Sequence, residues 1–159
     1  MNTRVQQVQS GEFADFDKVL SLLQRAFAYM DERIAPPSSL KQLDVAKIKL
    51  KAQQETLFLL TVNDEIAGCV FAKLNDGHVY LGKLAVDSRF RGRGYARRLM
   101  SRVEQHAQDN GIDYVELETR VELTENQQFF TAAGYVKIAE NAHRGYDRPT
   151  RYRYRKSVR

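Results

Sequence analysis

The sequence contains only one cysteine, few prolines and glycines, and no long apolar run. The single cysteine, Cys69, excludes an internal disulfide framework and a cysteine-rich zinc module. No apolar run approaches the roughly 18 residues that a membrane-spanning helix needs, and three prolines and nine glycines are too few for a fibrous chain. Residues 1–17 lack the apolar centre of a signal peptide. We therefore expect a soluble, cytoplasmic protein that makes no membrane contact.

What the sequence does contain is typical of a globular domain. Apolar residues make up 43% of the 159 residues and charged residues 28%, which predicts one domain spanning 1–159. The formal net charge is +5, but six cations and no acidic residue fall between Arg148 and Arg159, so the preceding chain is near neutral. The basic charge belongs to one terminal segment, which argues against nucleic acid as the main partner.

Hydrophobic periodicity and turn residues predict an order of elements with an antiparallel meander at its centre. Asn63-Asp64-Glu65 and Asn75-Asp76-Gly77 are typical of tight turns between strands, and Pro36-Pro37 separates the first two helices. A β-α-β unit follows the meander, so we expect an α+β or mixed α/β domain. The expected strands are Thr3–Gln9, Thr56–Val62, Ile66–Leu74, His78–Val86, Ile112–Thr119, Tyr135–Glu140 and Thr150–Lys156, and the expected helices are Asp15–Tyr29, Leu40–Gln54, Gly94–Asn110 and Thr124–Ala133.

The stretch Arg89–Gly94 carries the clearest chemical signal, because it joins a strand to a helix through an arginine- and glycine-rich loop. Gly92 and Gly94 have no Cβ, so a ligand can approach the backbone closely. The first amides of the following helix have no intrahelical partner and lie at the positive end of the helix dipole. These features predict a cradle for a di- or polyphosphate. A Walker loop is excluded because Tyr95-Ala96 follows Gly94, and a dinucleotide-binding loop because Arg97 stands where its third glycine belongs.

The pattern Arg89-Phe90-Arg91-Gly92-Arg93-Gly94 after Leu84-Ala85-Val86 resembles the acetyl-CoA signature of the GNAT superfamily of N-acetyltransferases. A second block, Asn126-Gln127-Gln128-Phe129-Phe130 followed by Ala133-Gly134-Tyr135, is similar to another motif of that family. The resemblance implies a mixed, mostly antiparallel sheet of about seven strands flanked by about four helices. It also implies that the fourth and fifth strands splay apart.

The resemblance implies how acetyl-CoA, the co-substrate, would be held. The backbone of Leu84, Ala85 and Val86 would pair with the pantetheine arm as an added strand, and a main-chain amide near Ala85 or Val86 would stabilise the oxyanion. The pyrophosphate would lie on the loop and the helix start. The implied cofactor-binding residues are Leu84, Ala85, Val86, Arg91, Gly92, Arg93, Gly94, Tyr95, Ala96, Arg97, Asn126 and Phe130. The family's frequent general-acid tyrosine aligns with Phe130, which has no proton to give.

The implied reaction moves an acetyl group to a primary amine of a small-molecule acceptor by direct attack in a ternary complex. The amine must lose a proton, and Glu118, late on the strand Ile112–Thr119, is our candidate base, with Glu116 in reserve. Residues of the first interhelical loop and the last hairpin would contact the acceptor, namely Tyr29, Asp31, Arg33 and Tyr146. No set of residues has metal-ligand spacing, so we expect no metal. A homodimer is consistent with the family.

Other interpretations stay open. Phe130 favours a sensor that binds acetyl-CoA without turnover. The run Arg151-Tyr152-Arg153-Tyr154-Arg155 predicts either a final strand, with tyrosines packed inward and arginines in water, or a surface for RNA or an acidic partner. His78, His106 and His143 are expected at the surface, and Cys69 is expected to be a buried, inert thiol.

Overall fold

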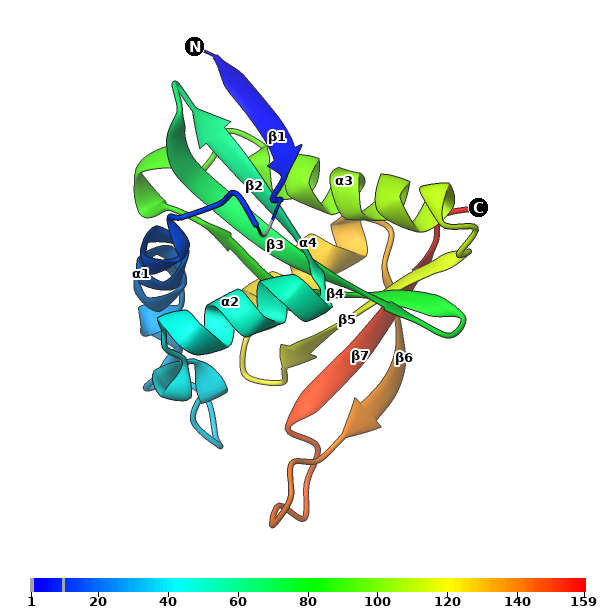
Figure 1. Cartoon of the computed structure of the whole chain (residues 1–159). Helices are drawn as coiled ribbons and strands as arrows, with labels where there is room; N and C mark the ends of the chain where they lie inside the picture. The colour runs from blue at the N-terminus through cyan, green and yellow to red at the C-terminus, as the bar shows by residue number, and fades with distance from the viewer. Residues whose placement is uncertain (1, 10) are drawn as a thin grey trace.

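The computed structural model describes residues 2–9 and 11–159, which form a seven-stranded sheet and four α-helices (Figure 1). The sheet order is β1-β2-β3-β4-β5-β7-β6; β4 and β5 run parallel, and the other neighbouring strands are antiparallel. The expected fold class is therefore confirmed. The elements are β1 (Thr3–Gln7), α1 (Phe16–Phe27), α2 (Val45–Gln54), β2 (Thr56–Val62), β3 (Glu65–Asn75), β4 (His78–Val86), α3 (Tyr95–Asp109), β5 (Tyr114–Arg120), α4 (Thr124–Ala132), β6 (Val136–Asn141) and β7 (Arg151–Ser157).

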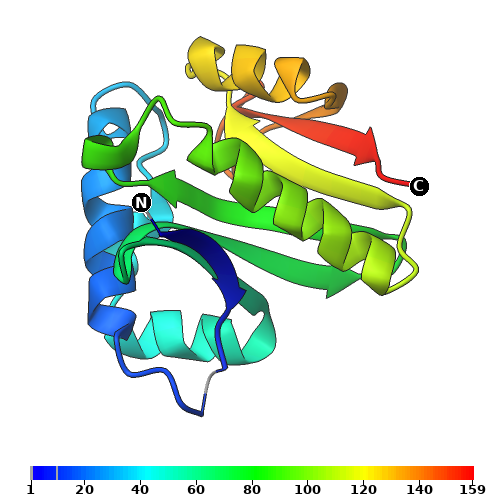
Figure 2. The same cartoon turned by 90° about the horizontal axis from the view of Figure 1, so that it is seen from above.

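Helices cover both faces of the sheet (Figure 2). Each face has its own apolar core. On one face α1 and α2 pack on β2, β3 and the end of β4, because α1 presents a continuous buried stripe that includes Phe16, Val19 and Leu23. On the other face α3 contributes Leu99 and Val103, and α4 adds partly buried phenylalanines. Cys69 is fully buried in the first core, and burial raises the pKa of its thiol to about 12, as an inert thiol requires.

The predicted helix Leu40–Gln54 is wrong in its first third. The structure instead has a short 3₁₀ turn, Ser39–Gln42, and then α2 from Val45, with Leu43 and Asp44 in extended conformation between them. The physical reason is a second cap: the Asp44 carboxylate accepts a hydrogen bond from the Lys47 amide at 2.8 Å, while Ser38 caps the 3₁₀ turn. Smaller differences occur elsewhere, where β1 ends at Gln7 and β5 begins at Tyr114. No helix in the described ranges is both long and apolar enough to cross a bilayer.

Candidate active site

A bulge in β4 opens the sheet beside β5. The β3–β4 register shifts between Cys69–Ala85 and Phe71–Gly82, and Lys83 in the bulge has a φ of 53°, which is left-handed backbone. β4 and β5 pair only at Val79–Val115 and Tyr80–Glu116. Beyond Tyr80 the two strands separate, so the expected splay is present. This is the point where irregular backbone exposes strand edges inside an otherwise continuous sheet.

A cavity of about 920 Å³ occupies this opening. Leu81 to Val86 of β4 and Leu117 to Arg120 of β5 line its two sides. The start of α3 contributes Ala96, and the turn that follows α1 contributes Tyr29. Of the residues expected to touch cofactor or acceptor, the lining contains Leu84, Ala85, Val86, Arg91, Ala96, Asn126, Phe130, Glu118 and Tyr29.

The remaining cofactor candidates lie around the N-terminus of α3. Gly92 and Gly94 have φ values of 78° and 79°, and no described atom lies within 4 Å of where their Cβ atoms would be. Gly94 is the N-cap and offers no side-chain hydrogen bond, which leaves the first amides of α3 open. The Tyr95 ring is buried in the α3 core, so only its backbone belongs to this surface. Arg97 lies in a shallow depression on the outer side of α3, away from the main cavity.

Asp87 anchors the loop between β4 and α3, a role that the sequence did not reveal. Its amide donates to the Ala67 carbonyl at 2.8 Å, and its carboxylate is buried against Arg25 at 3.1 Å and Arg89 at 3.3 Å. Burial would raise the pKa of Asp87, but hydrogen bonds from Arg89 and Arg25 outweigh burial and hold that pKa below its ordinary value. Arg89 also contacts Glu65 and is therefore a structural residue of the loop.

Arg33, which we expect to touch the acceptor, is not among the lining residues and ties the loop after α1 to the start of α4. Its guanidinium is paired with Glu125 and donates to the Glu122 carbonyl at 3.2 Å. The hydrogen bond from Arg33 holds the pKa of Glu125 at about 2. The Ala35 amide also donates to the Glu122 carboxylate, at 3.2 Å, so the loop has two attachments beside the cavity. The structure places neither Asp31 nor Tyr146 in the lining.

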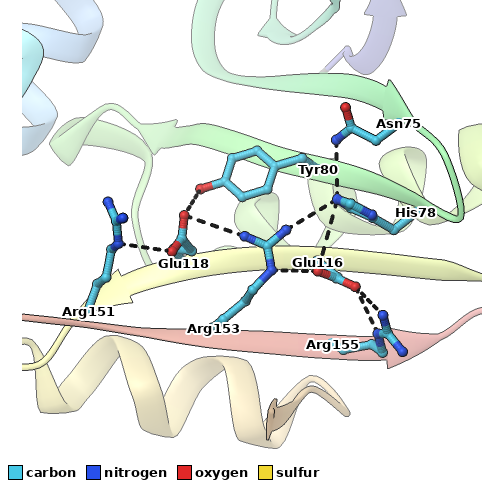
Figure 3. Close-up of polar contacts among 8 residues, drawn as sticks. All are labelled: Asn75, His78, Tyr80, Glu116, Glu118, Arg151, Arg153 and Arg155. Carbon is cyan, nitrogen blue, oxygen red and sulfur yellow. Dashed lines mark hydrogen bonds and ion pairs between the residues drawn. The ribbon is translucent and has the colours of Figure 1, made fainter. Parts of the chain in front are cut away.

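Glu118 lies in the cavity wall within a network of polar side chains on β4, β5 and β7 (Figure 3). The Tyr80 hydroxyl donates to its carboxylate at 3.3 Å, and Arg151 and Arg153 lie 3.2 and 3.6 Å from it. Burial, together with the charge of Glu118, raises the pKa of Tyr80 to about 12, so Tyr80 stays protonated and acts as a donor. The site thus combines an ionisable carboxylate with a fixed hydroxyl.

Glu116, the reserve base, is buried beneath this network and is absent from the cavity lining. It accepts from Arg153 Nε and, at 2.8 Å, from Arg155 Nε (Figure 3). Burial would raise its pKa, but the two arginine hydrogen bonds outweigh burial and lower it. The expectation that the arginines of this strand face water is therefore wrong, because β7 lies beside β5 and faces them toward two glutamates. The prediction that the tyrosines of this strand pack inward is confirmed, because Tyr154 is buried in the α3 core and Tyr152 packs against that core.

Glu116→Gln is expected to lower the free energy of unfolding at pH 7 by about 3 kcal/mol, the lower end of the range for breaking a buried ion pair, since both arginines can still reach water. The folded pKa lies below the ordinary value of 4.5, so this stabilisation is present above that value and is lost as pH falls through the folded pKa. Urea unfolding at several pH values should show a shallower acid loss in the variant than in the wild type. Parallel acid profiles would contradict the assignment.

The histidines are less exposed than expected. His78 is half-buried, with its Nε2 accepting from Arg153 at 3.2 Å and lying 3.2 Å from the Asn75 amide (Figure 3). His106 packs edge-on against Phe58, with ring centroids 5.4 Å apart. His143 lines the cavity and contacts the Thr150 hydroxyl. Among residues 2–9 and 11–159, no group of three or more His, Cys, Asp or Glu side chains could hold a metal ion.

Sequence reasoning missed several cavity residues, among them Lys83, Thr119 and Arg120. Lys83 lies in the bulge, which no sequence pattern signals. Thr119 is buried in the cavity wall, and its Oγ1 has no hydrogen-bond partner among the described residues. Arg120 donates to the Pro36 carbonyl at 2.7 Å. The Pro36-Pro37 pair was a visible signal for a loop, because proline has no backbone N–H and breaks a helix, which leaves nearby carbonyls to accept from side chains such as Arg120.

Comparisons with solved structures give the same fold at low sequence identity. The PaiA N-acetyltransferase from Thermoplasma acidophilum, solved with coenzyme A, aligns with a TM-score of 0.82, 10% identity and 99% coverage of both chains. The ribosomal-protein-alanine N-acetyltransferase from Escherichia coli aligns with a TM-score of 0.74 and 18% identity, covering 99% of this chain and 94% of that one. A GNAT-family acetyltransferase from Staphylococcus aureus gives 0.75 and 15%, covering 99% and 100%.

A search of curated proteins found no significant match. The family model for the acetyltransferase (GNAT) family matches residues 16–135, which is most of the chain and includes the β4 bulge, the α3 N-terminus and Glu118. The chain therefore belongs to the GNAT family of acetyltransferases.

Proposed function

We propose that this enzyme moves an acetyl group from acetyl-CoA to a primary amine of a small-molecule acceptor by direct attack in a ternary complex. The observation that carries the proposal is the cavity between β4 and β5, because it connects a site suited to the cofactor with a carboxylate suited to act as the base. One end meets Ala96 at the start of α3, where bare amides suit a diphosphate. The cavity also contains Glu118, a carboxylate able to accept a proton.

The residues present fit acetyl-CoA. Open space over Gly92 and Gly94 leaves the amides at the start of α3 accessible to phosphate oxygens, and Arg91 adds positive charge beside them. The separated edge of β4, from Leu84 to Val86, offers backbone groups to an extended amide-bearing arm. The unpartnered hydroxyl of Thr119 supplies one further polar group in the same wall. An amide of Ala85 or Val86 would face the thioester oxygen.

The acceptor amine is mostly protonated at neutral pH, since its pKa is roughly 10. Glu118 would take that proton, either directly or through one water molecule, while Tyr80 holds the carboxylate in place by its hydrogen bond. Phe130 lines the cavity at the position where the family often has a tyrosine, so it offers no proton to the leaving thiolate. A thiolate with a pKa of roughly 8.5 leaves readily, so this loss is a small one.

Acetyl-CoA is expected to raise the melting temperature. At 100 times the dissociation constant, ligand binding adds about 2.7 kcal/mol to folded-state stability, which corresponds to roughly 5–10 °C for a chain of this size. A panel of small amines, peptides and protein N-termini, read by release of free thiol, then identifies the acceptor class. Acetyl-CoA with enzyme and no amine serves as the control for background hydrolysis of the thioester.

Different outcomes contradict different parts of the proposal. The absence of any thermal shift would refute acetyl-CoA binding. A shift without thiol release on any amine would favour the sensor interpretation that Phe130 suggests. Thiol release on peptides alone would replace the small-molecule acceptor with a protein N-terminus; the Escherichia coli neighbour is itself an alanine N-acetyltransferase of ribosomal protein S18.

A further inference from the structure

Lys83 is a cavity residue that the proposed reaction does not use. It lies in the β4 bulge with left-handed backbone, which is an unfavourable conformation for a residue with a Cβ. Its side chain lies within electrostatic range of Lys51 of α2 and of Glu55, the residue that follows α2, so it is on the α1/α2 face of the sheet. Lys51 lines the same cavity, together with Ser38 and Ser39.

The charges around Lys83 do not balance. Lys51 is already paired with Glu55 at 2.7 Å and lies over the Phe71 ring. Lys83 has no hydrogen-bonded or ion-paired carboxylate in the part of the chain that the structure describes. Burial, and next the charge of Lys51, lower the pKa of Lys83, and the opposing charge of Glu55, which is paired with Lys51, does not outweigh them. The cluster Lys51–Lys83–Glu55 therefore carries one uncompensated positive charge.

The rest of the cavity does not supply the missing anion. Its lining includes five cations, Lys51, Lys83, Arg91, Arg120 and Arg151, but only two carboxylates. Glu118 is paired with Arg151, and Glu125 is paired with Arg33. Both carboxylates are thus engaged away from Lys83. A negatively charged group of a bound ligand would therefore compensate the positive charge of Lys83.

Given the proposed function, on which this step rests, we propose that the acceptor is an amino acid, whose carboxylate binds Lys83 and Lys51 while its amine meets Glu118. One uncompensated charge matches a monoanionic carboxylate better than a dianionic phosphate monoester. Two ammonium groups provide charge-assisted donors. The Ser38 hydroxyl, which accepts from the Leu40 amide at 3.2 Å, keeps its own hydrogen free to donate to the same ligand.

The test compares amino acids with their α-carboxamides, which keep the amine and lose the negative charge. Lys83→Met keeps the side-chain length and the same left-handed backbone, and Lys73→Met is a matched control on the exposed face of β3. We expect wild type and Lys73→Met to prefer the amino acid. In Lys83→Met, kcat/KM for the amino acid should fall about tenfold or more, as for loss of a charge-assisted hydrogen bond. The value for the amide should change less than twofold.

Two further readouts separate this inference from the proposed function. Acetyl-CoA should raise the melting temperature of Lys83→Met as it does for the wild type, which also shows that the variant folds. In the wild type alone, the des-amino carboxylic acid should compete with the amine acceptor and leave acetyl-CoA binding unchanged.

The inference would be overturned if the ratio of kcat/KM for the amino acid to kcat/KM for its α-carboxamide were the same in the wild type and in Lys83→Met. Acetylation of the carboxamides alone would also overturn it. No thiol release with any amine would overturn the proposed function itself.

Discussion

Gly94→Glu is expected to abolish the thermal shift that acetyl-CoA produces in the wild-type protein. Gly94 caps α3 with a φ of 79°, and open space surrounds the position that a side chain would take. A glutamate there places a negative charge where a diphosphate would bind. Two like unit charges 4 Å apart near a protein surface repel by about 4 kcal/mol, which corresponds to roughly a thousandfold loss of affinity. Differential scanning fluorimetry across an acetyl-CoA titration measures the effect.

The matched control is Gly111→Glu, just beyond the other end of α3. Gly111 has a φ of 68° and equally open surroundings, so it carries a similar conformational cost of about 1–2 kcal/mol but lies away from the loop. Both variants should have melting temperatures somewhat below that of the wild type. Acetyl-CoA should raise the melting temperature of Gly111→Glu but not that of Gly94→Glu. A normal shift in a folded Gly94→Glu protein would refute the phosphate cradle at α3.

Glu118→Gln is expected to reduce kcat by about 10²- to 10⁴-fold, the usual contribution of a general base. The amide has the size of the carboxylate and can still accept the Tyr80 hydrogen bond, but it does not take a proton from the amine. The acetyl-CoA thermal shift should be unchanged, because Glu118 does not belong to the α3 end of the cavity. Steady-state thiol release with the identified acceptor measures kcat and KM separately.

Glu140→Gln is the control for this variant, since Glu140 is an exposed strand carboxylate on β6 paired only with Lys137 among the described residues. Its kcat should equal that of the wild type. Full activity in Glu118→Gln would remove Glu118 from the mechanism. A drop accompanied by loss of the thermal shift would show that the residue supports the fold of the cavity rather than proton transfer.

The sequence predicted the elements whose signals are local. The period-two run of β7 correctly placed its tyrosines inward, and Gly92 and Gly94 correctly located the start of α3. The break before α2 was also encoded locally, because Ser38 and Asp44 are both cap-forming residues, but helical spacing from Leu40 onward concealed it.

Long-range pairing was the part that local patterns did not reveal. The surroundings of Arg151, Arg153 and Arg155 depend on which strand neighbours β7, and this is decided by the order of the sheet. With β5 as the neighbour, the arginines lie beside Glu116 and Glu118, and Arg151 becomes part of the cavity wall. The position of Lys83 depends in the same way on a register shift between β3 and β4.

The position of β7 between β5 and β6 affects the order in which the sheet assembles. β6 precedes β7 in the chain, yet in the described structure it pairs only with β7. Among the strands described, β6 is therefore connected to the rest of the sheet only through β7, and we expect the two strands to enter or leave the sheet together as one hairpin. Because β7 contacts Glu118 through Arg151 and Arg153 and also buries Tyr154 in the α3 core, a local opening of this hairpin would disturb the cavity wall and part of that core together, while the α1/α2 core, to which neither strand contributes a described residue, would stay folded.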